Sequence, residues 1–205
     1  GFTSIGGNAF RDCDNLVSLT IGSSVTNIGA AAFFNCNKLP SLTIPNTVTK
    51  IAAQAFQYCQ ALPTVIIPDS VTSIEGFVFE QCINLKSVTI PDTVTKIGTQ
   101  AFLHCESLES VTIPNTVTTM GNNVFQNCYK LNNVVISNSL TSLGTSSFQN
   151  CNSLVTVLLP RSIQSLGSNC FGHCDLLTTL ICDDGLDNAA ASVTNPNTDF
   201  KTIDE

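Results

Sequence analysis

The sequence predicts a repeat solenoid of the α/β class, a stack of coils that each contribute a parallel strand and a short helical or 3₁₀ turn. Three residue types carry this prediction, because each recurs at an unbroken interval of 23 residues. Cysteine does so at Cys13, Cys36, Cys59, Cys82, Cys105, Cys128, Cys151 and Cys174. A phenylalanine precedes each of these cysteines by three places, and a leucine follows each by three. Self-similarity at such a period decides the fold before any local pattern is considered.

The strand of each coil is indicated by alternation, as in the segment LKSVTI that ends at Ile90. Val88 and Ile90 alternate there with Ser87 and Thr89, which is the period-two pattern of a strand with one buried face. Pro91 then removes a backbone donor, so we expect the ladder to end there. The same proline recurs at Pro45, Pro68, Pro114 and Pro160, whereas Gly22, Ser137 and Asp183 stand in its place elsewhere.

The rest of the coil returns to the start of the next strand. Val94 and Ile97 are expected to point inward, and Gly98 permits a bend. Residues 101–105 then offer apolar groups at helical or 3₁₀ spacing, so we predict a short helical turn on the side opposite the strand. The coil closes there, and the pattern restarts at Leu108.

The full motif, LxxVxIPxxVTxIGxxAFxxCxxL, resembles the leucine-rich repeats of the BspA-like surface proteins. The resemblance covers residues 2 to 185, and the Phe, Cys and Leu of the motif occur in every unit. It implies a curved right-handed solenoid with parallel strands on its concave face. It also implies adhesion to host or matrix proteins, at the cell surface or after secretion.

Hydroxyl side chains follow the strands, where ordinary leucine-rich repeats place asparagine: Ser24, Thr47, Ser70, Thr93, Thr116, Ser139 and Ser162. We expect them to make the same kind of backbone hydrogen bond more weakly. With the threonines two places later they form a Ser/Thr-x-Thr column that resembles the ice-binding face of some antifreeze solenoids. An ice-binding solenoid is therefore a remote alternative, although threonine is also a preferred strand residue and curvature would spoil a flat lattice.

Ten cysteines raise the question of disulfides or zinc. The 23-spaced thiols come one per coil, so they do not converge on one ion, and we predict no metal site. We interpret this column as buried free thiols in the core, because free cysteine behaves as a small hydrophobe. Cys170 and Cys182 replace the alanine and isoleucine of the motif in the last full coil, and we hypothesise a disulfide between them.

Catalytic signatures are absent from the sequence. His104 and His173 are the only histidines, and they occupy one repeat position three coils apart, roughly 14 Å or more at the ~4.8 Å spacing of parallel strands. There is no H-E-x-x-H, G-x-S-x-G or P-loop motif. We therefore predict a protein that is not an enzyme and that needs no cofactor.

Charge restricts the partners. Eight Lys and Arg stand against fifteen Asp and Glu, and the net charge of −7 disfavours nucleic acid and anionic membrane surfaces. No apolar run approaches the ~20 residues of a membrane span. Only 11% of residues are charged, so the surface must be rich in neutral polar groups. We predict that the concave face binds a protein ligand, such as an extracellular matrix or host surface protein, through Ser41, Thr43, Thr64, Ile66, Ser87, Thr89, Ser110, Thr112, Asn133 and Val135.

The sequence divides into residues 1–185, which hold eight repeats with the first entered midway, and residues 186–205, which we expect to form a partial C-terminal cap and an acidic tail. The midway start leads us to expect a fragment of a longer protein. The surface location depends on the family resemblance alone. Unpaired thiols would also suit the cytosol, so an intracellular interaction scaffold of the same fold is the alternative function.

Overall fold

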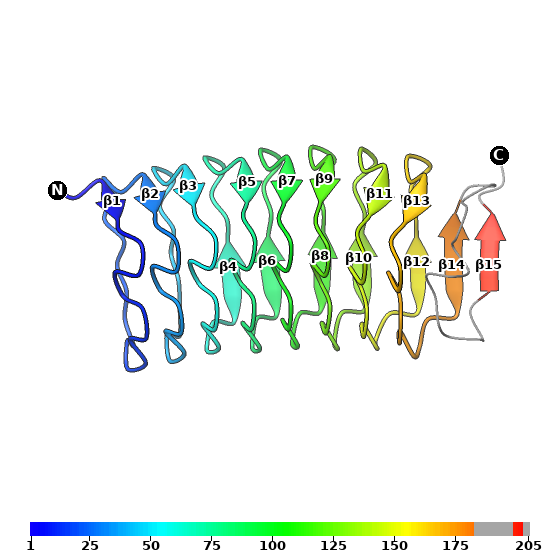
Figure 1. The fold of residues 1–205 in the computed structure, drawn as a ribbon, viewed down its shortest axis with the longest axis horizontal. Coiled ribbons are helices and arrows are strands. Elements are labelled where there is room, and N and C mark those ends of the chain that lie inside the picture. Colours follow the sequence, from blue (N-terminus) through cyan, green and yellow to red (C-terminus); the bar gives the residue numbers. More distant parts are fainter. Residues whose placement is uncertain (183–198, 203–205) are drawn as a thin grey trace.

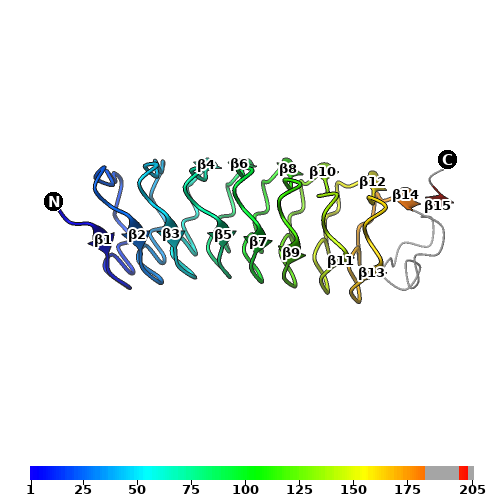
Figure 2. The ribbon, with the colours of Figure 1, turned by 90° about the horizontal axis from the view of Figure 1, so that it is seen from above.

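The computed structural model describes residues 1–182 and 199–202, the latter through their backbone only. These residues form an elongated, gently curved stack of coils with the N-terminus at one end (Figures 1 and 2). Equivalent residues of successive coils pair 23 positions apart, as Thr64 does with Ser87. The predicted repeat solenoid with its 23-residue period is thus confirmed.

One long side of the stack carries the predicted parallel strands, and we call it the strand face. Its strands are β4 (Thr64–Ile66), β6 (Ser87–Thr89), β8 (Ser110–Thr112), β10 (Asn133–Val135), β12 (Thr156–Leu158) and β14 (Thr179–Cys182). In the five three-residue strands the central residue packs toward the core and its two neighbours point outward, and in β14 Leu180 and Cys182 are buried. The alternation read from the sequence is therefore confirmed for these coils.

The two N-terminal coils lack this strand, although their sequences carry the same alternation. Ser41 and Thr43 are exposed as predicted but lie in irregular backbone. Equivalent positions in later coils donate a ladder bond, as the Lys86 N–H does to the Pro63 carbonyl. Proline has no N–H to donate, and it occupies this position both ahead of Ser41, as Pro40, and ahead of β4, as Pro63. Loss of these two donors explains why the ladder begins only at β4.

A second row of short parallel strands, which the sequence did not predict and which we call the second ladder, follows the strand positions after the proline turn. It consists of the short strands β1 (Ser4–Ile5), β2 (Asn27–Ile28), β3 (Lys50–Ile51), β5 (Ser73–Ile74), β7 (Lys96–Ile97), β9 (Thr119–Met120), β11 (Ser142–Leu143) and β13 (Ser165–Leu166). These strands pair in three sheets, β1–β2–β3, β5–β7–β9 and β11–β13. The expected inward residues, such as Ile97, are buried in it. Two residues are too short a run to show a period-two pattern.

The predicted helical turns are wrong, and with them the α/β class. Residues 1–182 and 199–202 contain no helix, so this part of the chain is all β with turns. Gln100 and His104 adopt left-handed backbone angles, with φ of 59° and 58°, and such residues interrupt a right-handed helix. Alternate N–H groups of this segment donate to carbonyls of the next coil, as the Phe102 N–H does to the Val124 carbonyl at 3.0 Å, a typical hydrogen-bond distance. Stacking therefore replaces the helical hydrogen bonds.

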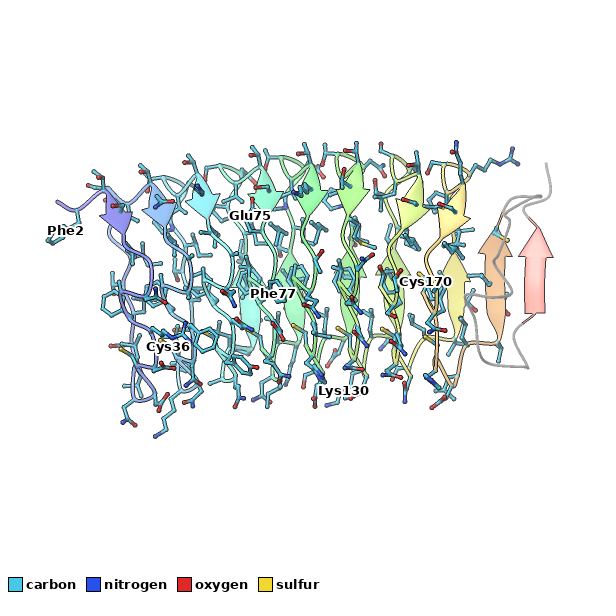
Figure 3. All side chains as sticks on the ribbon, in the orientation of Figure 1. Phe2, Cys36, Glu75, Phe77, Lys130 and Cys170 are labelled. Carbon is cyan, nitrogen blue, oxygen red and sulfur yellow. The ribbon has the colours of Figure 1, made fainter. Side chains whose placement is uncertain are left out.

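The core lies between the two ladders and the turn segments. Its main component is a column of parallel phenylalanine rings, with centroids between 5.1 Å (Phe10 and Phe33) and 5.7 Å (Phe56 and Phe79) apart. Phe33 and its equivalents up to Phe171 are fully buried, whereas Phe10 in the first coil is 40% exposed. Figure 3 shows Phe2 standing out beyond that end of the stack.

At the C-terminal end, β15 (Asp199–Thr202) pairs in parallel with β14, with Asp199 beside Thr179. The strand face therefore gains one further strand beyond the last repeat. The remainder of the predicted cap and tail, residues 186–198 and 203–205, lies outside the described residues. The predicted boundary at residue 185 lies there too.

Candidate interaction face

The strand face presents a regular array of exposed, mostly polar side chains. The predicted residues on β4, β6, β8 and β10 all point outward and are exposed: Thr64, Ile66, Ser87, Thr89, Ser110, Thr112, Asn133 and Val135. The residues between them, such as Val65 and Val111, are buried in the core. The structure thus brings eight of the ten predicted residues together on one sheet, and Ser41 and Thr43 lie beyond its N-terminal edge.

This face carries no charge on its outward-pointing side chains from β4 to β12. Hydroxyls dominate its middle, where Ser87, Thr89, Ser110 and Thr112 line a shallow hollow between β6 and β8. Towards the C-terminal end the outward side chains become apolar, and Val135 and Leu158 are 50% and 56% exposed. The face is therefore neutral throughout and graded from hydroxyl to aliphatic.

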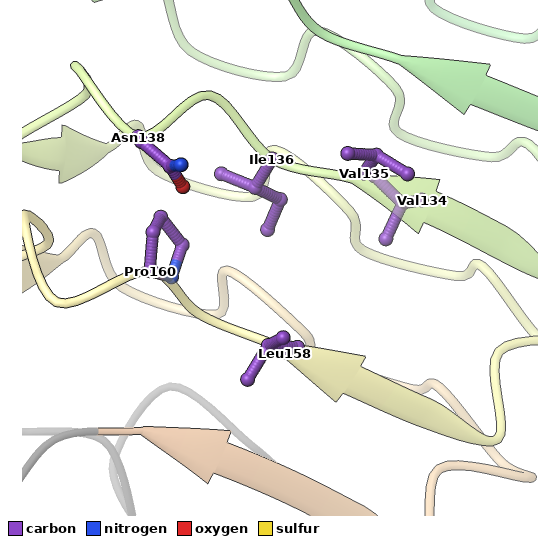
Figure 4. Close-up of a pocket in the computed structure, with 6 residues that line it drawn as sticks. All are labelled: Val134, Val135, Ile136, Asn138, Leu158 and Pro160. Carbon is purple, nitrogen blue, oxygen red and sulfur yellow. The ribbon is translucent and has the colours of Figure 1, made fainter. Parts of the chain in front are cut away.

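Sequence reasoning missed a break in this sheet. β4, β6, β8 and β10 form one sheet, and β12, β14 and β15 form another, with no ladder pairing between β10 and β12. A hollow of about 170 Å³ opens at the break, lined by Val134, Val135, Ile136, Asn138, Leu158 and Pro160 (Figure 4). The replacement of the motif threonines by Val135 and Leu158 is the only sequence signal at this place.

Four of the seven hydroxyls that follow the strands make the expected coil-to-coil bonds, whereas the buried Ser162 hydroxyl has no partner among the described residues. Thr47, Thr93 and Thr116 donate to the valine carbonyl of the preceding coil at 2.7–2.9 Å, as Ser70 does at 2.6 Å. The second column of threonines is also engaged, since Thr49 donates to the Thr26 carbonyl at 3.3 Å. Hydroxyls bonded within the protein do not favour an ice-binding lattice.

Ser137 shows how the fold tolerates loss of the strand-ending proline. Its side chain is fully buried, and its hydroxyl donates to the Val117 carbonyl at 2.8 Å. The same oxygen accepts a bond from the Ser139 N–H at 3.1 Å. In the preceding coil the equivalent bond to a valine carbonyl is made by Thr116, whose counterpart here is Ser139. Ser137 therefore makes this bond in place of Ser139.

The cysteine column forms a second ladder inside the core. Each thiol from Cys36 to Cys174 in the 23-residue series donates to a phenylalanine carbonyl of the preceding coil, at 3.1–3.4 Å. Burial raises the pKa of the Cys82 thiol to about 12, so it stays protonated at neutral pH. Cys170 and Cys182 are also buried free thiols in the structure, which gives the hypothesised disulfide no support.

The two histidines lie in the turn segments. The His104 imidazole is partly exposed, with Nε2 2.9 Å from the Asn127 amide nitrogen and Nδ1 3.5 Å from a Glu106 carboxylate oxygen. His173 is exposed. Within residues 1–182 and 199–202, no three His, Cys, Asp or Glu side chains gather closely enough to hold a metal ion.

No segment in the described part of the chain is a helix with the length and apolarity that a bilayer span requires.

Comparison with solved structures shows the same fold in bacterial proteins. A leucine-rich repeat protein from Bacteroides ovatus aligns with 98% of this chain and 64% of its own, at 24% identity and a TM-score of 0.70. The T. pallidum leucine-rich repeat protein aligns over 98% and 80% of the two chains, at 24% identity and a TM-score of 0.59. The pneumococcal vaccine antigen PcpA aligns over 98% and 60%, at 18% identity and a TM-score of 0.62. The chain thus spans about two thirds or less of the B. ovatus and pneumococcal proteins.

No curated protein sequence matches the chain. The family profile described as "BspA type Leucine rich repeat region (6 copies)" does match, over residues 1–106 and 72–198. These two overlapping matches cover nearly the whole sequence, and they agree with the 23-residue period and the stacked fold. The chain belongs to the BspA-type leucine-rich repeat family, a class of repeats that generally serve as protein-interaction modules.

Proposed function

We propose that this chain is the adhesion module of a surface protein and binds host or matrix proteins through its strand face. The observation that carries the proposal is the uncharged array on β6 and β8, where Ser87, Thr89, Ser110 and Thr112 are exposed side by side. Hydroxyls both donate and accept hydrogen bonds, so rows of them suit a protein partner's backbone and neutral polar side chains.

The chemistry of the face predicts how binding behaves. Because its outward residues carry no charge, long-range steering contributes little, and association is slow and only weakly dependent on salt. Affinity then comes from many hydrogen bonds around a few buried contacts. The aliphatic end of the face, at Val135 and Leu158, is where such contacts would concentrate.

An extracellular location is supported by family membership and by the antigen character of one similar protein. The pneumococcal protein of the same fold is described as a vaccine antigen. In that setting a rigid solenoid would hold its strand face out toward the partner, because each coil adds one strand to a continuous surface.

A charge-insertion variant tests the proposed face. Replacing Ser87, Thr89, Ser110 and Thr112 with lysine should abolish binding to the matrix protein that the wild type binds. The matched control replaces Thr119, Ser142 and Ser165 of the second ladder and the adjacent Thr141 with lysine; these residues are also exposed, and the change adds the same charge. Undiminished binding by the folded strand-face variant, or equal loss in the control, would place the site elsewhere.

An intracellular interaction scaffold is the second candidate, and the thiols favour it. All ten cysteines are free, and nine of them are buried. Unpaired thiols are typical of reducing compartments. Fractionation of the source cells with an antibody to this chain separates the two candidates, because a scaffold remains with the cytosol whereas an adhesin is accessible to protease on intact cells.

A further inference from the structure

One junction between neighbouring coils has no strand pairing on either of its two ladders. It lies between the coil that carries β3 and the coil that carries β4 and β5 (Figure 1), and we call it the β3/β5 junction. On the strand face β4 has no partner in the preceding coil, and on the second ladder β3 and β5 belong to different sheets. Each of the other junctions from β1 to β14 keeps a pair of strands on at least one of these sides.

The hydrogen bonds of the second ladder are interrupted at the same place. At the next junction along the chain, the Gly98 N–H donates to the Ile74 carbonyl at 2.7 Å. Among the described residues, the Glu75 N–H makes no equivalent bond to Ile51. The N–H and the hydroxyl of Thr72 also lack the bonds that the equivalent threonine of the next coil makes to its preceding coil. Both ladders are therefore open at this one junction.

The turn segments supply the backbone hydrogen bonds that still cross the β3/β5 junction. Three N–H groups of one turn segment donate to carbonyls of the next at 2.8–3.1 Å, those of Gln54, Phe56 and Tyr58. Side-chain bonds add to them, as the Ser70 hydroxyl does by donating to the Val48 carbonyl at 2.6 Å. The rings of Phe56 and Phe79 have centroids 5.7 Å apart, the largest spacing in the phenylalanine column. Two bodies joined along one strip are arranged as a hinge.

Two residues that depart from the repeat explain the open ladders. Pro63 stands ahead of β4 and has no N–H for the strand face. Glu75 (Figure 3) stands where each of the four following coils has glycine. A Cβ added to the first of these, Gly98, would lie 2.5 Å from a backbone nitrogen of the preceding coil, so close approach favours a residue without a side chain.

The size of the Glu75 side chain matters as well as its presence. Ala52 carries a methyl group at the equivalent position of the preceding coil, and β3 still pairs there with β2. The glutamate is longer, and its carboxylate accepts a bond from the Ser73 hydroxyl at 2.8 Å. That bond holds the side chain against β5, at the side of the coil where the second ladder is interrupted.

We propose that the solenoid bends at the β3/β5 junction, with the turn segments as the hinge. Residues 1–61 move as one block against the block that carries β4 to β14, because paired strands join the coils within each block. Bending here opens no existing ladder bond, so it costs less free energy than at any other junction. Ser41 and Thr43 lie in the first block and the array on β6 and β8 lies in the second, so bending changes the angle between these surfaces. The inference does not depend on the identity of the partner.

Distances between paired spin labels, measured by pulsed EPR, test the hinge. Labels on a non-natural amino acid avoid the ten native thiols. Labels at Thr26 and Thr118 span the β3/β5 junction, whereas labels at Thr72 and Gln164 span the same number of coils beyond it, and all four positions are exposed. The first pair should give a distance distribution about twice as wide as the second. Equal widths would overturn the inference.

A restored junction provides the control for cause. Pro63→Thr returns a backbone donor and Glu75→Gly returns the glycine, so the double variant should narrow the first distribution to the width of the second. Ala52→Gly, at a junction that is already paired, should leave the first distribution wide. A distribution that stays wide in the double variant, or that narrows equally in Ala52→Gly, would overturn the roles assigned to Pro63 and Glu75.

Discussion

The Cys105 thiol donates to the backbone carbonyl of Phe79 in the preceding coil, with 3.3 Å between sulfur and oxygen. The same relationship joins Cys82 to Phe56 and Cys128 to Phe102 at 3.4 Å. Both side chains of each pair are fully buried, so the thiol must satisfy its hydrogen bond inside the core. The cysteine column is therefore a structural ladder that holds successive coils in register.

This ladder predicts that the fold loses stability in alkali. The pKa of Cys82 is raised by burial from 9.0 to about 12, and burial also raises the pKa of Cys59, Cys105, Cys128 and Cys151. Below pH 9 the thiols are protonated in both states. Above it the unfolded chain releases protons that the folded chain retains, so the free energy of unfolding falls by up to about 1.4 kcal/mol per pH unit for each thiol.

Urea unfolding between pH 8 and pH 11 measures this effect. A Cys105→Ala variant, destabilised overall, should show a shallower decline than the wild type, because one fewer thiol titrates on unfolding. Parallel pH profiles for the two proteins would contradict the role given to the column.

Thiol labelling should follow unfolding. The folded protein should react slowly with an alkylating reagent at neutral pH, because buried protonated thiols are poor nucleophiles. In denaturant without reductant, intact mass should show ten modified thiols, since all ten are free. Eight modifications, rising to ten after reduction, would restore the disulfide hypothesised between Cys170 and Cys182.

Close backbone contact between coils makes Gly98 intolerant of a side chain. A Cβ added to Gly98 would lie 2.5 Å from the Gly76 nitrogen and 2.7 Å from the Glu75 carbonyl carbon. We expect Gly98→Ala to lower the free energy of unfolding by about 1–3 kcal/mol or more, since backbone must shift. Gly22→Ala is the control, because nothing lies within 4 Å of its added Cβ, and it should stay within about 1 kcal/mol of wild type. Chemical denaturation of both variants measures the difference, and equal stabilities would contradict the close approach.

The buried hydroxyl of Ser137 should contribute more to the stability of the fold than an exposed hydroxyl does. Ser137→Ala leaves the Val117 carbonyl without its side-chain donor and should cost about 1–3 kcal/mol. Ser142→Ala, on the exposed side of β11, should change stability by less than about 0.5 kcal/mol. Thermal unfolding of both variants measures these changes in stability. An unchanged stability of Ser137→Ala would show that the fold does not need this hydroxyl where serine stands in place of the motif proline.

The sequence predicted the features that repeat and missed those that depend on neighbouring coils. The strand at Ser87–Thr89, the buried Phe102 and the thiol of Cys105 all follow from periodicity. The helical turn was wrong because apolar spacing at 101–105 does not reveal the left-handed backbone of Gln100 and His104. Those angles are imposed by hydrogen bonds to the next coil.

The same limit applies to the candidate site. Alternation identified the exposed rows on β4 to β10, but it extended them to Ser41 and Thr43, where proline removes the ladder donors. The break between β10 and β12 could not be read from the sequence, because no proline stands at that junction to remove a ladder donor. It is a property of packing over several coils.

Surface binding to a panel of matrix and plasma glycoproteins, fibronectin and fibrinogen included, tests the central claim most directly when repeated across a salt range. A neutral strand face predicts saturable binding to at least one of them that weakens less than about threefold between 50 and 500 mM salt, since few screened charge pairs contribute. Steeply salt-dependent binding would assign the contact to charged residues elsewhere. No binding by the folded protein to any of the panel would contradict adhesion to these partners.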